Sequence, residues 1–93
     1  MIKSFKCKEA AKIWDIGDSR RFPDDIVKRA IIKLAMLNRS ATLYDLSVPP
    51  SNRLEKLLGD REGQYSIRIN DQYRVCFRWI NNDAEDVEIV DYH

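Results

Sequence analysis

The chain has 93 residues, of which 44% are hydrophobic and 33% charged, so it forms at most one small domain, residues 1–93. It lacks a run of about 18 apolar residues, and its opening residues do not resemble a signal peptide, so we expect neither a membrane span nor secretion. In the cytoplasm, the expected location, Cys7 and Cys76 would be buried free thiols. With a single histidine, we expect no metal site.

The net charge of +1 conceals an uneven distribution along the chain. Residues 1–52 carry ten basic and six acidic side chains, whereas residues 79–93 carry five acidic and no basic ones. A basic body beside an acidic terminal segment suits either a nucleic acid or a charged protein partner. The total charge is too low for a general nucleic-acid coat.

Two amphipathic helices are predicted in the first half, after a short edge strand at residues 2–5. Apolar residues predict a first helix over residues 8–14, with Gly17 as its stop. Three- and four-residue apolar spacing predicts a second helix over about residues 24–37, with Asn38 as its stop. Its basic residues outside the apolar stripe either bind RNA phosphates or form a solvated face: Lys28, Arg29 and Lys33.

The second half is predicted to be mainly strand. Residues 41–46 suit one more helical turn, and Pro49-Pro50 then starts an extended loop. Strict alternation predicts a hairpin of residues 64–70 and 73–79 and a last strand over residues 85–92. Helices followed by strands indicate an α+β fold.

The hairpin register has a consequence for the arginines. A three-residue loop at residues 70–72 keeps the apolar side chains of both strands on one face. The same register places Arg68 opposite Arg74 on the other face, with Arg78 further along it. Because opposed like charges are unfavourable, we expect the pair to require an anion, and two guanidiniums suit a phosphate.

Few residues offer other chemistry. Nucleotide-binding glycine loops and metalloprotease or hydrolase motifs are absent from the sequence, so we expect no cofactor. The segment Asp91-Tyr92-His93 is either a solvated chain end or a set of catalytic groups. An imidazole transfers protons near neutral pH, and a tyrosine ring stacks on bases. With arginines, these groups supply the acid, base and cation that metal-free RNA cleavage requires.

Residues 48–79, which include Gly59-Asp60-Arg61-Glu62-Gly63, closely resemble the HigB toxins, also called plasmid-maintenance killer or GraT-like proteins. The opening residues 1–5 and the ending residues 87–93 resemble the same family, part of the RelE/ParE superfamily. The resemblance implies a RelE-like α+β fold with helices on a curved antiparallel sheet of about four strands. It also implies a metal-independent endoribonuclease that cuts mRNA in the ribosomal A site by 2′-OH attack, and so inhibits translation and growth.

The resemblance further implies particular partners. These are a HigA-like helix-turn-helix antitoxin, the 70S ribosome and mRNA, with operator DNA bound only through the antitoxin. Two alternatives remain open, a non-enzymatic gyrase inhibitor like the ParE toxins and a pure protein-interaction module. A terminal proton-transfer group and opposed arginines favour the ribonuclease, since gyrase binding needs no proton transfer.

Roles carried over from the family fall mainly on the end of the chain. His93 would be the leading proton-transfer group, Tyr92 would stack on or orient the nucleotide, and Asp91 would assist. Arg68 and Arg74 would contact the scissile phosphate. We expect these arginines and the imidazole to surround one shared hollow.

The resemblance leaves the general base undecided. Glu55 stands where some HigB proteins carry a histidine, so Glu55 is either the base or a bystander on an edge strand. Candidate RNA contacts implied by position and charge are Arg53, Lys56, Arg61 and Arg78.

Overall fold

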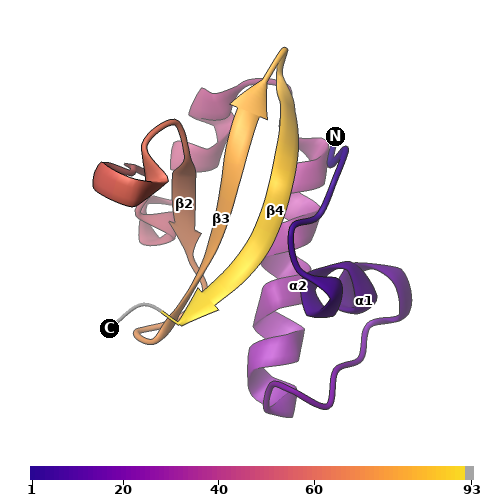
Figure 1. Ribbon diagram of the computed structural model, residues 1–93. Helices are drawn as coiled ribbons and strands as arrows, with labels where there is room; N and C mark the ends of the chain where they lie inside the picture. Colours follow the sequence, from indigo (N-terminus) through magenta and orange to yellow (C-terminus); the bar gives the residue numbers. More distant parts are fainter. Residues whose placement is uncertain (92–93) are drawn as a thin grey trace.

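The computed structural model describes residues 1–91 as two helices packed on one face of a four-stranded antiparallel sheet (Figure 1). This confirms the α+β class. The helices are α1 (Lys8–Ile16) and α2 (Asp24–Arg39), and the sheet order is β1 (Glu55–Lys56), β2 (Tyr65–Arg68), β3 (Tyr73–Ile80) and β4 (Asp83–Asp91). Two short 3-10 helices join α2 to β1, η1 (Leu43–Ser47) and η2 (Pro50–Asn52), and a third, η3 (Gly59–Arg61), lies between β1 and β2. Among residues 1–91, no helix combines the length and apolar character that crossing a bilayer requires.

The helix ends follow local capping chemistry. Helix α1 ends at Gly17 as predicted, because Gly17 takes the left-handed conformation (φ 68°) that closes a helix. Cys7 caps its beginning, with Sγ accepting from the Ala10 N–H at 3.4 Å. The predicted stop of α2 at Asn38 is wrong, since the helix continues to Arg39. The Asn38 side chain instead accepts a hydrogen bond from the Ile2 N–H at 3.0 Å, which ties the N-terminal segment to α2.

The N-terminal segment lies along β4 without forming a regular strand. Two isolated parallel bridges pair it with β4, Ile2 with Ala84 and Phe5 with Val87. The prediction of an edge strand at residues 2–5 is therefore wrong, although the segment still covers the free edge of β4 (Figure 1).

The hairpin register is the predicted one. Strand β2 pairs with β3 so that Ile67 faces Val75 and Arg68 faces Arg74. The intervening turn is held by Asn70, whose Oδ1 accepts from the N–H of Gln72 (2.9 Å) and of Tyr73 (2.7 Å). This local bonding ends β2 at Arg68, two residues before the predicted limit.

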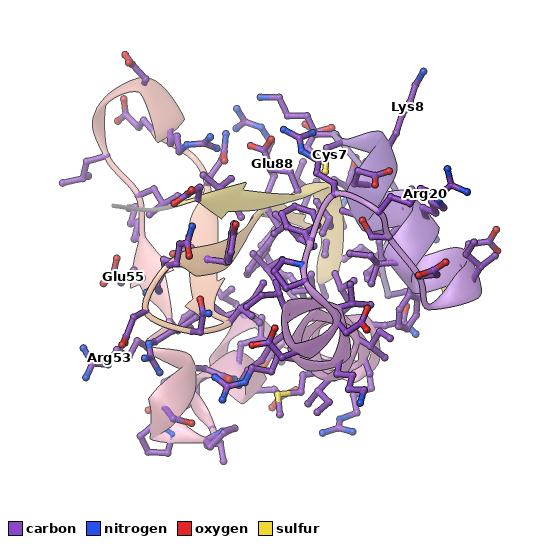
Figure 2. The ribbon with its side chains drawn as sticks, turned by 90° about the horizontal axis from the view of Figure 1, so that it is seen from below. Cys7, Lys8, Arg20, Arg53, Glu55 and Glu88 are labelled. Atoms are coloured by element: carbon purple, nitrogen blue, oxygen red, sulfur yellow. The ribbon has the colours of Figure 1, made fainter. Side chains whose placement is uncertain are left out.

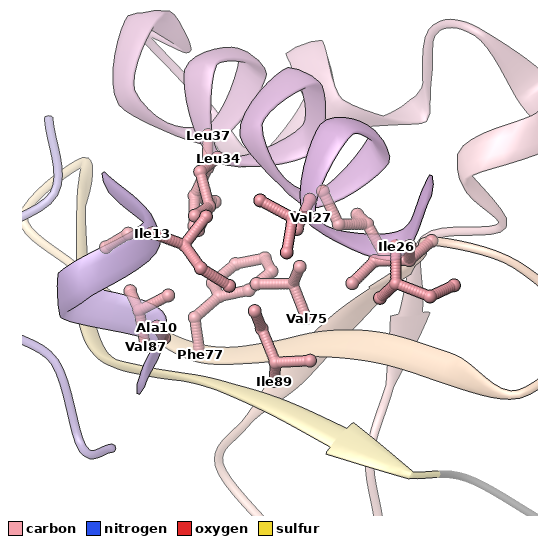
Figure 3. Close-up of a cluster of buried hydrophobic side chains, with 14 of the residues drawn as sticks. Ala10, Ile13, Ile26, Val27, Leu34, Leu37, Val75, Phe77, Val87 and Ile89 are labelled. Atoms are coloured by element: carbon pink, nitrogen blue, oxygen red, sulfur yellow. The ribbon is translucent and has the colours of Figure 1, made fainter. Parts of the chain in front are cut away.

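The core lies between the helices and the inner face of the sheet, the face toward α1 and α2 (Figure 3). Its centre is Phe77 of β3, which is fully buried and lies 6.3 Å, centroid to centroid, from the rings of both Tyr65 and Trp79. Full burial of such an apolar side chain contributes about 1.5–3 kcal/mol. The strand alternation therefore selects the buried face and leaves the other residues of each strand on the outer face, the opposite side of the sheet.

Candidate functional site

The outer face of β2 and β3 carries five polar side chains, and three of them are buried although no α-helix covers them. They alternate along each strand with the residues that face the core: Ser66, Arg68, Arg74, Cys76 and Arg78. Ser66 and Cys76 are fully buried, and Arg74 is 8% exposed. Buried polar groups need hydrogen-bond partners, so their partners define the site.

Arg74 is held firmly by oxygen atoms of the protein. Its Nε donates to the Ser66 hydroxyl at 2.8 Å, and its Nη2 donates to the backbone carbonyl of Arg53 at 2.5 Å. The guanidinium fork thus has a set position between β2 and the segment that enters β1. A buried, oriented guanidinium of this kind is suited to stabilising charge on a phosphate.

Arg68 lies opposite Arg74 in the sheet and has a different partner. Its Nη2 forms an ion pair with Asp71 in the turn, and the Arg68 side chain is 30% exposed. Protein oxygens therefore accept hydrogen bonds from both arginines. The Asp71 carboxylate is an anion that meets Arg68, whereas Arg74 is bound by neutral oxygens. The expectation that the pair binds a phosphate stays a prediction.

The end of β4 reaches the same end of the sheet. Asp91 pairs with Tyr73, and Val90 pairs with Arg74. The Gln72 amide donates to Asp91 Oδ2 at 3.1 Å, which ties β4 to the β2–β3 turn. Asp91, the last described residue, thus lies on the strand next to β3, opposite the residue that precedes Arg74. Tyr92 and His93 lie outside the described residues, so their roles stay predictions.

Two of the predicted RNA contacts have carboxylate partners. Arg61 Nη1 lies 2.6 Å from Glu88 Oε1, and Arg78 Nε lies 3.6 Å from Asp86 Oδ2. These ion pairs offset part of the positive charge that both arginines would offer a phosphate. Their assignment as RNA contacts remains a prediction.

The remaining predicted residues lie on β1 and the turn before it. Arg53, Glu55 and Lys56 are exposed, and Figure 2 shows Arg53 and Glu55 on the same side of the molecule, remote from Lys8 and Arg20. Glu55 pairs with Ser66, whose hydroxyl binds Arg74. Because opposed residues of an antiparallel pair share a face, Glu55 belongs to the outer face near Arg74.

The free cysteines are not suited to nucleophilic chemistry. Cys76 is fully buried close to Arg61 and Glu88, and Cys7 is half-buried. Burial raises the pKa of the Cys76 thiol, so the thiol stays protonated at neutral pH. The expectation of a buried free thiol is confirmed for Cys76 and only in part for Cys7.

A pocket that the sequence did not indicate lies between α2, η2 and the end of β2. Its volume is about 260 Å³, and its lining residues are Arg29, Ile32, Lys33, Ser51, Arg68 and Ile69. The spacing of the basic residues on α2 is compatible with two roles for Arg29 and Lys33, contact with RNA phosphates or a solvated helix face. Only the packing of α2 against the end of β2 brings them to Arg68.

The chain shares its small α+β fold with solved structures of other proteins. It superposes on YoeB in a YoeB–YefM complex from Staphylococcus aureus with a TM-score of 0.63, covering 100% of this chain and 98% of that one at 19% identity. A YoeB dimer from the same species gives a TM-score of 0.62 at 21% identity, covering 99% and 97% of the two chains. At such identities the likeness establishes the fold.

Sequence similarity identifies the family. A family model for HigB-like toxins, described as the RelE-like toxin of type II toxin-antitoxin system HigB, matches residues 3–93. The chain is 40% identical over 85 residues to Toxin HigB-1 of Vibrio cholerae, covering 90% of each protein. It is 33% identical over 93 residues to Endoribonuclease HigB of Proteus vulgaris, covering 100% of both. The chain belongs to the HigB-like toxin family, which confirms the resemblance seen in its sequence.

Proposed function

We propose that this toxin is a metal-independent endoribonuclease that cleaves mRNA in the A site of the 70S ribosome and so inhibits translation. The relative from Proteus vulgaris, which matches the whole chain, carries the name Endoribonuclease HigB. The observation that carries the proposal is the buried guanidinium of Arg74, oriented by Ser66 and Arg53 beside Arg68 and the end of β4. A phosphate placed there meets a fixed cation beside the strand that leads to the terminal acid–base residues.

In the proposed reaction, the ribose 2′-oxygen attacks the adjacent phosphorus atom. The new P–O2′ bond forms as the P–O5′ bond breaks, giving a 2′,3′-cyclic phosphate and a free 5′-hydroxyl. One group removes the 2′-proton and another protonates the departing 5′-oxygen, each contributing about 10²- to 10⁴-fold. Arg74 and Arg68 stabilise the charge that develops on the phosphate.

The acid–base roles fall on the residues named from the resemblance. We assign His93 as the leading proton-transfer group, Tyr92 to stacking on the nucleotide, and Asp91 to assisting. Glu55 is the candidate base, which is supported by its pairing with Ser66 next to Arg74. Its exposed carboxylate is accessible to a ribose hydroxyl.

Membership of a type II toxin-antitoxin family implies an antitoxin, and we propose a HigA-like helix-turn-helix protein. This partner neutralises the toxin and supplies the contact with operator DNA. The Staphylococcus aureus protein with a similar fold has been solved with its own partner, YefM. The low net charge fits an enzyme that the ribosome helps to position on its RNA.

The deciding experiment is primer extension on mRNA bound to translating ribosomes. Wild-type protein should cut within A-site codons and scarcely cut naked RNA, and Arg74→Ala should lose this cutting. Arg20→Ala is the matched control, because Arg20 is an exposed arginine remote from Glu55 (Figure 2). Thermal unfolding of both variants separates loss of chemistry from loss of fold. Inhibition of gyrase supercoiling without RNA cleavage would contradict the proposal.

A further inference from the structure

The pocket between α2, η2 and the end of β2 gathers positive charge. Of its six lining side chains, three are cationic and none is acidic: Arg29, Lys33 and Arg68. Arg68 pairs with Asp71, which is almost fully exposed. Within residues 1–91, neither Arg29 nor Lys33 has an ion-pair partner. The described part of the chain therefore leaves two cations of this pocket uncompensated by a carboxylate.

Lys33 is held in place at the pocket wall. Its Nζ donates to Asn52 Oδ1 at 2.5 Å, and Asn52 is fully buried, with its Nδ2 donating to the Leu46 carbonyl at 3.1 Å. Burial lowers the pKa of the Lys33 ammonium, and the guanidiniums of Arg68 and Arg29 lower it further. Three cations around one cavity repel one another, so the arrangement is favourable when an anion enters.

We propose that this pocket binds a phosphate group of the RNA strand next to the phosphate that is cleaved, an inference that rests on the proposed function. The pocket shares Arg68 with the candidate site, so a strand lying across Arg74 continues into it. Guanidiniums match phosphate oxygens with paired hydrogen bonds. The apolar walls, Ile32 and Ile69, and the Ser51 side chain lie where a ribose or base beside the phosphate would rest.

The two wall isoleucines provide a direct test. The intact protein, with ¹³C-labelled isoleucine methyl groups, is titrated with single-stranded RNA whose riboses are 2′-O-methylated, which blocks cleavage. We expect the Ile32 and Ile69 methyl signals to shift. Lys33→Gln should lower the slope of the logarithm of the RNA-binding constant against the logarithm of the salt concentration by about 0.7, the value for one phosphate contact with a single strand. This change in slope corresponds to about a fivefold change in affinity between 1 M and 0.1 M salt. Lys28→Gln, an exposed lysine of the same helix outside the pocket, should have little effect.

Each other outcome of the binding experiment overturns the proposal. Equal weakening by both lysine variants would indicate diffuse attraction, and no methyl shift with RNA would exclude the site. Methyl shifts with polyglutamate as large as those with RNA would assign the pocket to an acidic peptide. Methyl shifts with inorganic phosphate alone would assign the pocket to a small anion. Ribosome-dependent cleavage is measured separately, so cleavage without methyl shifts refutes the pocket alone. Methyl shifts without cleavage refute the endonuclease and leave RNA binding in place.

Discussion

The two faces of the sheet bury side chains by different means. On the inner face, Val75 and Phe77 of β3 are fully buried against the helices. On the outer face, Ser66, Arg74 and Cys76 are also buried, yet no α-helix lies over them (Figure 1). Apolar burial stabilises without regard to direction, whereas buried polar groups require partners at set distances and angles. The inner face therefore supplies stability, and the outer face supplies a fixed geometry.

The outer face obtains its partners from segments outside the long strands. Arg53 in the turn before β1 gives Arg74 a carbonyl oxygen, and Arg61 in η3 reaches Glu88 on β4. Both connections cross between segments that are far apart in the chain. The irregular segment between η2 and β2, which contributes little to the apolar core, thus positions the candidate site.

The largest effect is expected on the inner face. Phe77→Ala should lower the free energy of unfolding by about 3–5 kcal/mol, because it removes a fully buried ring and leaves a cavity. Urea denaturation measures this loss. Tyr44→Ala, at a side chain that is 82% exposed, should change stability by no more than about 0.5 kcal/mol. Equal losses for both variants would show that the core is not centred on Phe77.

The largest effect on activity is expected at Arg74. Arg74→Lys keeps the positive charge but cannot make the forked hydrogen bonds to Ser66 and Arg53. We expect ribosome-dependent cleavage to fall by about 10²-fold, comparable with loss of an oriented donor at a developing charge. Quantitative primer extension measures the rate. Near-wild-type cleavage would mean that charge alone, without orientation, serves at this position.

A smaller effect on cleavage is expected at Ser66, because its hydroxyl orients the Arg74 guanidinium without carrying a charge. Ser66→Ala removes the hydroxyl that accepts from Arg74 Nε and should cost about 1–3 kcal/mol of stability, since a buried donor loses its acceptor. Cleavage should fall less than in Arg74→Lys, because the Arg53 carbonyl still binds the guanidinium. The control is Ser47→Ala, whose hydroxyl donates to the Tyr44 carbonyl in an exposed turn. A Ser66 variant as stable as this control would contradict the assigned role.

The smallest effect is expected at a carboxylate outside both faces. The backbone N–H groups of Thr42 and Ala41 donate to Asp45 and hold its pKa below the ordinary value of 3.8. Because the folded pKa is lowered, this contribution to stability is fully present above the unfolded pKa. It is lost as the pH falls through the folded pKa. Unfolding measured from pH 6 down to pH 2 should show a weaker acid dependence for Asp45→Asn than for the wild type. An unchanged acid limb would contradict this assignment.

The sequence predicts the division of the sheet into an inner and an outer face. The period-two alternation of β2 and β3 predicted their register, because a slip by one residue would expose every apolar side chain. That register put Arg68 opposite Arg74 as expected. The partners of these arginines were not predictable, since Ser66, Asp71 and the Arg53 carbonyl are selected by side-chain rotamers and by a turn outside the hairpin.

The sequence by itself determined the fold class, the family, the inner and outer faces of the sheet and the chain positions of the candidate catalytic groups. Local periodicity and capping chemistry decide the fold class and the two faces of the sheet, and both depend on neighbouring residues. The family and the candidate catalytic positions follow from the resemblance to the HigB toxins. Only the tertiary structure decided that Arg29 and Lys33 of α2 meet Arg68 of β2 around one pocket. The rotation of a helix against the end of a strand is set by packing between distant segments, and no local pattern encodes it.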